Sequence, residues 1–146
     1  MTEAFIQVSG NAELVRQGLQ NFDADIVKIG RRTIYNTSVR IKNRLRIYPP
    51  ERPDQTYVRT FALRDSVRVT GLPSGYVISV NPISPKGVAY GGYVVGDADG
   101  NGQAWMHKDR WPQFANVALE EIYTLPDEIV NELELSAENN GLEFKK

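Results

Sequence analysis

Oxygen-bearing side chains recur at every second position of the loop GDADGNG. Asp97, Asp99 and Asn101, with the glycine after them, match the opening of a calcium-binding loop, in which oxygen ligands stand first, third and fifth. The match ends at the twelfth position, where a bidentate glutamate belongs and Lys108 stands instead. Asp, Asn and Gly are also ordinary turn residues. We therefore expect a turn without metal or cofactor, with Asp97, Asp99 and Asn101 as the residues to test for calcium.

Catalytic residue types are scarce. His107 is the only histidine, and the chain contains no cysteine. No serine lies in a G-x-S-x-G context, so acyl-transfer chemistry has no candidate nucleophile and base. His107 with Asp97, Asp99 and Asp109 suggests a small metal-dependent enzyme around residues 97–109, although this spacing matches no known motif. A histidine that positions a surface loop explains the same residue, and we expect a protein that is not an enzyme.

A long amphipathic helix, predicted for residues 23–48, is the element around which the rest of the chain is organised. Its less polar positions recur at spacings of three, four and seven residues and form one stripe, Val27, Ile34, Ser38, Ile41 and Leu45. Asp23 is the expected N-cap, and Pro49 and Pro50 end the helix. Nothing on the stripe is reactive, so we expect it to support a sheet.

The other segments predict an α+β fold, in which a small, mostly antiparallel sheet packs against the long N-terminal helix and a C-terminal helix. Residues 5–19 predict a short strand and a short helix. Alternation over residues 66–70 and 76–80, around a turn rich in Gly and Pro, predicts a β-hairpin. Residues 88–95 fit a bulged strand or a helical turn, and residues 103–107 fit a last strand.

The C-terminal helix is expected to begin at Asp109, with Pro112 in its first turn. Pro126 lies inside its apolar stripe, so we expect a kink or a break into two helices. Residues from about 137 have little to bury and predict a poorly packed tail. The chain shows no internal repeat, and 146 residues are expected to form one domain, 1–146.

Targeting signals are not evident in the sequence. The start of the chain lacks the basic segment and long apolar run of a signal peptide. No stretch approaches the ~18 apolar residues of a membrane span. We therefore expect synthesis in a cytoplasm and no membrane partner.

The formal net charge of −1 conceals an asymmetry. Between Lys28 and Arg68 there are eleven Lys and Arg against three acids, whereas from Asp97 onward there are eleven acids against four bases. Pairing within the chain, complementary faces on neighbouring copies, and a nucleic-acid surface all fit this pattern. A nucleic-acid-binding protein would use the basic helix, residues 28–46, although aromatic residues are not interleaved with its charges as a stacking platform requires.

Aromatic residues gather around the glycine-rich loop, namely Tyr90, Tyr93, Trp105 and Trp111. Aromatic side chains in such a region fill cores, and they are also enriched at protein interfaces. We expect Trp111 in the core at the start of a helix and Trp105 partly at an interface.

Short motifs follow one another in a recognisable order. The opening FIQVSGNAELVRQGLQNF gives a strand, a glycine and a short helix, and the long helix then runs into a proline. The segment RTFALRDSVRV matches the pattern T-G-x-L-R-x-S-I at Thr60, Leu63, Arg64 and Ser66. The segment VAYGGYV matches Y-A-x-Y-V at Tyr90, Tyr93 and Val94. Over residues 5–122 the chain thus resembles the tail-completion and head-to-tail joining proteins of long-tailed bacteriophages.

The chain departs from the pattern of this family in two places. Phe61 and Ala62 stand where the family usually has a glycine before the leucine. Val95 and Gly96 replace the frequent Glu-x-Gly-Thr that follows the Y-A-x-Y-V motif. These differences affect the expected geometry of the two loops.

The resemblance implies a structural virion protein, a subunit of a commonly hexameric ring at the neck or at the top of the tail. Its partners would be other copies of itself, head connector or adaptor proteins, and tail tube or tail terminator proteins. DNA would pass through the lumen without sequence-specific binding, and the protein would reside in the virion neck or tail after synthesis in the host cytoplasm. We expect the interface to include Arg59, Arg64, Tyr90, Tyr93, Trp105, His107 and Arg110.

The charge asymmetry suggests how copies would recognise each other. A ring contact joins two different patches, and a chain with a basic middle and an acidic end supplies such a pair. Our hypothesis is that the basic segment faces an acidic surface that belongs in part to the neighbouring copy, with Arg59 and Arg64 in the contact.

Overall fold

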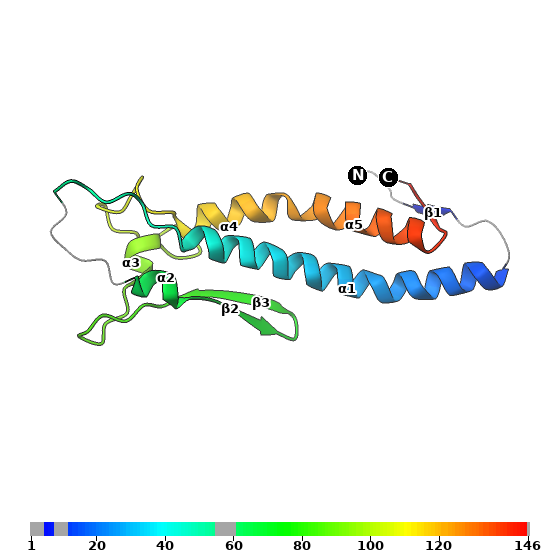
Figure 1. Cartoon of the computed structure of the whole chain (residues 1–146), viewed down its shortest axis with the longest axis horizontal. Coiled ribbons are helices and arrows are strands. Elements are labelled where there is room, and N and C mark those ends of the chain that lie inside the picture. The colour runs from blue at the N-terminus through cyan, green and yellow to red at the C-terminus, as the bar shows by residue number, and fades with distance from the viewer. Residues whose placement is uncertain (1–4, 8–11, 55–60, 146) are drawn as a thin grey trace. The chain divides into compact units, whose positions relative to one another are not determined.

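The computed structural model describes residues 5–7, 12–54 and 61–145. Along the chain the elements are β1 (Phe5–Gln7), α1 (Ala12–Leu45), α2 (Ala62–Ser66), β2 (Val67–Leu72), β3 (Gly75–Val80), α3 (Gly91–Val95), α4 (Phe114–Tyr123), α5 (Leu125–Asn139) and β4 (Glu143–Lys145) (Figure 1). The strands form two antiparallel pairs, β1 with β4 and β2 with β3. The predicted α+β class, with a long N-terminal helix and a C-terminal helix, is confirmed.

The chain divides into two compact units. Met1–Ile34 and Thr124–Lys146 form the terminal unit, and Tyr35–Tyr123 form the central unit. The boundary falls inside α1, so the two halves of this helix contribute to different units. The expected single domain over residues 1–146 stays a prediction.

In the terminal unit, the first half of α1 runs antiparallel to α5 (Figure 1). Phe22, Ala137 and Leu142 are buried together, and Leu133 packs against them. Gly18 permits a close approach, because a Cβ atom at this position would lie 2.5 Å from the carbonyl oxygen of Asn140. This glycine inside α1 is therefore a packing position.

The C-terminal segment differs from the poorly packed tail expected from about residue 137. The Leu142 N–H donates to the Ala137 carbonyl at 2.9 Å, and the Gly141 N–H donates to the Glu138 carbonyl at 3.0 Å. With Gly141 at a φ of 70°, this is a Schellman motif, which ends α5 and returns the chain onto it. The segment Asn-Asn-Gly-Leu is a typical signal for this motif, and β4 then pairs with β1.

The buried face of α1 differs from the predicted stripe in its first half. Ser38, Ile41 and Leu45 are buried as expected, whereas Val27 and Ile34 are exposed. Further buried positions on α1 are Phe22, Ile29, Thr33 and Thr37. The Thr33 hydroxyl donates to the Ile29 carbonyl at 2.8 Å, which satisfies its polar group inside the packed face. The prediction was wrong here because threonine was not treated as a core residue.

The central unit has its own core, formed by Ile41, Leu45, Leu63, Val67, Val94, Val95, Trp111 and Val117. The expected hairpin is confirmed as β2 and β3, whose register pairs Val67 with Val80 and Leu72 with Gly75. The second half of α1 lies beside α4 (Figure 1), and arginines of α1 form ion pairs with glutamates of α4. The predicted position of Trp111 in the core is also confirmed.

Several element boundaries differ from those predicted. One helix covers Ala12–Leu45, so Asp23 is a helical residue rather than an N-cap. Of the two possibilities for residues 88–95, the helical turn is present as α3, and residues 103–107 form turns and irregular backbone instead of a strand. Asp109 has a φ of 60° and precedes a helix that begins only at Phe114.

The predicted interruption at Pro126 is confirmed. Helix α4 ends at Tyr123, and α5 begins at Leu125 with the proline in its first turn. Proline lacks a backbone N–H, and the first turn is where that donor is not needed.

Candidate interaction surface

A row of aromatic rings crosses the central unit. Tyr93 meets His107 edge-on with ring centroids 5.9 Å apart, and His107 meets Trp111 at 6.0 Å. Trp111 continues to Tyr48 at 4.8 Å, and Tyr48 continues to Phe61 at 5.2 Å. Edge-to-face contacts at these separations are the favoured geometry of aromatic pairs. The row thus connects the buried Trp111 with two exposed ends, Tyr93 and Phe61.

At one end, Phe61 precedes helix α2 and has a φ of 58°. A left-handed conformation is unusual for a bulky residue and costs about 1–2 kcal/mol. The Arg64 guanidinium carbon lies 4.6 Å from the centre of the Phe61 ring, and its Nε donates to the Asp65 carboxylate at 2.9 Å. This hydrogen bond lowers the pKa of Asp65. Phe61 and Arg64 therefore form one exposed surface patch that combines an aromatic ring with a positive charge.

At the other end, α3 and the turns after it present apolar side chains to solvent. Trp105 is 80% exposed, and Met106 and Tyr93 are also exposed. Backbone bonds hold this segment, since the Ala104 N–H donates to the Tyr93 carbonyl at 2.9 Å. The Gln103 side-chain amide donates to the Val94 carbonyl at 2.9 Å. A fixed backbone that presents an exposed tryptophan suits a contact with another protein.

His107 lies between these groups and is partly buried. Burial, with a smaller contribution from Arg110, lowers its pKa and favours the neutral ring. Among the residues that the structure describes, its buried Nδ1 atom and the buried Nε1 atom of Trp111 have no hydrogen-bond partner. The side chain thus contributes one ring to the aromatic row, between Tyr93 and Trp111.

The predicted interface residues fall at different parts of the central unit. Tyr93 and His107 are in contact, and Trp105 lies on the same segment, whereas Arg64 is at the opposite end of the row. Tyr90 packs against the core, and Arg110 donates to the Pro50 carbonyl at 2.9 Å, which fastens a loop. Arg59 lies outside the described residues.

Tyr48, Phe61 and Met106 belong to this surface but were not among the predicted interface residues. Phe61 could have been identified from the sequence, because it stands where the motif has glycine.

The loop that contains the candidate calcium ligands Asp97, Asp99 and Asn101 is held by hydrogen bonds to its own backbone groups. The Asp97 Oδ1 atom accepts the N–H groups of Asp99 at 3.0 Å and of Asn101 at 2.8 Å. The Gln113 side-chain amide donates to the Gly100 carbonyl at 2.8 Å. Within residues 5–7, 12–54 and 61–145, no group of three or more His, Asp or Glu side chains is placed to hold a metal ion. The geometry is that of a hydrogen-bonded turn.

Arginines of the basic helix form ion pairs with glutamates of the same chain. In the terminal unit, Arg32 pairs with Glu132 at 2.5 Å. In the central unit, Arg40 and Arg44 bind Glu121 at 2.7 and 3.1 Å, and Arg44 also pairs with a neighbouring glutamate. The hydrogen bond from Arg40 is the largest cause of the lowered pKa of Glu121. Pairing within the chain thus accounts for three of the cations that suggested a nucleic-acid surface or a neighbour.

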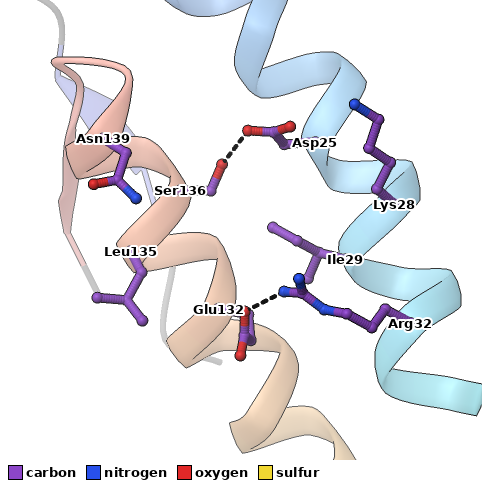
Figure 2. Close-up of a pocket in the computed structure, with 8 residues that line it drawn as sticks. All are labelled: Asp25, Lys28, Ile29, Arg32, Glu132, Leu135, Ser136 and Asn139. Carbon is purple, nitrogen blue, oxygen red and sulfur yellow. Dashed lines mark hydrogen bonds and ion pairs between the residues drawn. The ribbon is translucent and has the colours of Figure 1, made fainter. Parts of the chain in front are cut away.

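A pocket of about 360 Å³ lies in the terminal unit between α1 and α5 (Figure 2). Asp25 accepts hydrogen bonds from Ser136 Oγ at 2.8 Å and from Asn140 Nδ2 at 3.3 Å, and these bonds lower its pKa. Arg32 and Glu132 close the opposite end of the pocket (Figure 2). Because Asp25 is bonded to Ser136 and Asn140, and Arg32 to Glu132, we interpret the pocket as part of the contact between two helices rather than as a reaction centre.

The described helices include none that is long and apolar enough to cross a membrane. Comparisons with protein-family models, with curated proteins and with solved structures find no match for this chain.

Proposed function

We propose that this protein is a structural subunit of a ring at the neck or at the top of the tail of a long-tailed bacteriophage. The ring, commonly hexameric in the family that the chain resembles, would join the tail tube to the head connector while DNA passes through its lumen. The subunit would work by binding other proteins and would catalyse no reaction.

The observation that carries this proposal is the meeting of two motifs that are distant in the sequence. Leu63 of the first motif and Val94 of the second are buried in the same core, and Ser66 closes α2 by donating to the Leu63 carbonyl at 2.7 Å. Phe61, at the glycine position of the first motif, has a φ of 58°, a conformation that glycine adopts readily. The motif residues thus have the structural roles that their types suggest.

The exposed apolar side chains also favour a protein that is covered by partners. Among the described residues, nineteen large apolar side chains are exposed, against thirteen apolar residues that are buried. Single exposed apolar residues are ordinary, but clusters mark interfaces. Trp105, Met106 and Tyr93 form such a cluster on the segment fixed by α3.

The other two functions receive less support from the same geometry. A nucleic-acid-binding helix needs its guanidinium groups for phosphates, yet Arg32, Arg40 and Arg44 are bonded to glutamates. A metal-dependent enzyme needs convergent ligands, yet the Asp97 carboxylate is occupied by backbone N–H groups of its own loop.

The test is the mass of the purified protein in solution, measured by native mass spectrometry and sedimentation, with electron microscopy of any closed ring. Trp105→Glu should reduce ring formation while the thermal transition is unchanged. Tyr123→Glu is the matched control, because Tyr123 is as exposed as Trp105 but lies at the end of α4 and not on the segment that carries Tyr93, Trp105 and Met106. A chain that forms no ring, alone or with purified connector and tail-tube proteins, would contradict the proposal.

A further inference from the structure

The first half of α1 carries a second apolar face, whose side chains are exposed in the part of the chain that the structure describes. Its members are Leu19, Ile26, Val27 and Ile34, exposed by 41%, 41%, 58% and 37%. At 100° per residue they fall within about 100° of one another around the helix axis. Phe22 and Ile29, which pack toward the core, lie on a neighbouring arc of the same helix. All four residues belong to the terminal unit.

The spacing of this face is the same when it is read in either direction. Leu19 precedes the midpoint between Ile26 and Val27 by the same number of residues by which Ile34 follows it. Two copies of the helix placed antiparallel about this midpoint therefore put Leu19 opposite Ile34 and Ile26 opposite Val27. A two-fold contact requires this reciprocity: if Leu19 of one copy contacts Ile34 of the second copy, Ile34 of the first copy contacts Leu19 of the second.

Two further positions fit the same register. Gly30 lies on this face, and a Cβ atom there would meet nothing within 4 Å, so the second helix can approach closely. Asp23, in the middle of the face, falls opposite Gly30 of the second copy and next to its exposed Arg31. A parallel pair in the same register would instead set Asp23 against Asp23. Charge therefore favours the antiparallel arrangement.

We propose that this face binds the same face of a second copy of the chain, as an antiparallel helix pair with its two-fold axis between Ile26 and Val27. The contact lies in the terminal unit and uses none of the residues of the aromatic row. It does not rest on the proposed ring, whose contacts join two different patches.

The chain contains no cysteine, so single cysteines report the contact without background. Ile26→Cys lies near the axis and should form an intermolecular disulfide with itself under mild oxidation. Leu19→Cys should not, because the two Leu19 positions would be about 22 Å apart along the axis, at ~1.5 Å per residue. A mixture of Leu19→Cys and Ile34→Cys should form the mixed disulfide.

Gln17→Cys is the matched control, because Gln17 is exposed on the opposite side of α1. Crosslinking of Ile26→Cys should be at least about tenfold faster than that of Gln17→Cys, since the contact raises the effective concentration of the thiols. Ile26→Asp should lower the dimeric fraction in sedimentation, and Gln17→Asp should leave it unchanged, with circular dichroism showing that both variants fold. Self-crosslinking of Leu19→Cys, equal rates for the Ile26 and Gln17 variants, or dimers that persist in Ile26→Asp would overturn the proposal.

Discussion

Replacing Phe61 by glycine should leave a more stable protein than replacing it by alanine. At most positions the alanine variant is the more stable of the two. Both changes remove the ring contacts with Tyr48 and with Arg64, so these losses cancel in the comparison. Alanine keeps the cost of a left-handed backbone, about 1–2 kcal/mol, at the φ of 58° that this position adopts. Glycine avoids that cost but adds ~0.4–1 kcal/mol of unfolded-state entropy. The expected difference is about 1 kcal/mol in favour of glycine.

Urea unfolding of the two variants, followed by circular dichroism, measures this difference. Gln20 supplies the control, because it is exposed inside α1, where Gln20→Gly should be less stable than Gln20→Ala by ~1 kcal/mol. The difference in unfolding free energy between the glycine and the alanine variant should therefore have opposite signs at Phe61 and at Gln20. If Phe61→Ala is the more stable variant of its pair, the left-handed turn before α2 is wrong, and the correspondence with the family's glycine loses its structural support.

Three other expectations follow from burial, close approach and charge. Leu45→Ala should cost ~2–5 kcal/mol in denaturant unfolding, whereas Ile34→Ala should cost below about 1 kcal/mol, because Leu45 is 1% exposed and Ile34 lies outside the buried face. Gly18→Ala should destabilise the protein because its Cβ atom would strike a carbonyl oxygen at 2.5 Å, whereas Gly30→Ala, in open space, should raise the melting temperature of dilute protein. Glu121 has a lowered pKa, so its ion pairs stabilise the fold above its ordinary value of 4.5, and this contribution is lost as the pH falls through the folded pKa. The stability gap between the wild type and Glu121→Gln should therefore be widest near neutral pH and close as the pH falls below the folded pKa of Glu121, and a gap that does not change with pH would contradict this account.

The sequence predicted those elements whose signal is local. The hairpin followed from alternation on either side of a turn, and the break at Pro126 followed from a missing backbone donor. The predicted buried stripe was also correct in the second half of α1, where the apolar Ile41 and Leu45 are buried.

Predictions that depended on tertiary contacts were less successful. Thr33 enters the core because its hydroxyl bonds to the preceding turn of its own helix, which hydrophobicity alone does not indicate. The tail is an exception, because it packs through the Schellman motif around Gly141, whose Asn-Asn-Gly-Leu signal is local. The aromatic row joins Tyr48 to Tyr93 through Trp111, and no spacing along the chain brings these residues together.

The charge asymmetry has a different explanation in the structure from the one first expected. The arginines of α1 that pair with Glu121 and Glu132 neutralise part of the basic middle within the chain itself. An exposed ion pair such as that of Arg32 with Glu132 contributes only ~0–1 kcal/mol, so it orients the helices more than it stabilises them. What remains for contacts between copies is a surface with exposed apolar groups, among them Trp105 and Ile26. We therefore expect copies to associate chiefly through apolar contacts. The hypothesis that basic residues contact an acidic surface of a neighbouring copy then applies only to the segment that contains Arg64. The guanidinium of Arg64 already contacts Asp65 and the Phe61 ring.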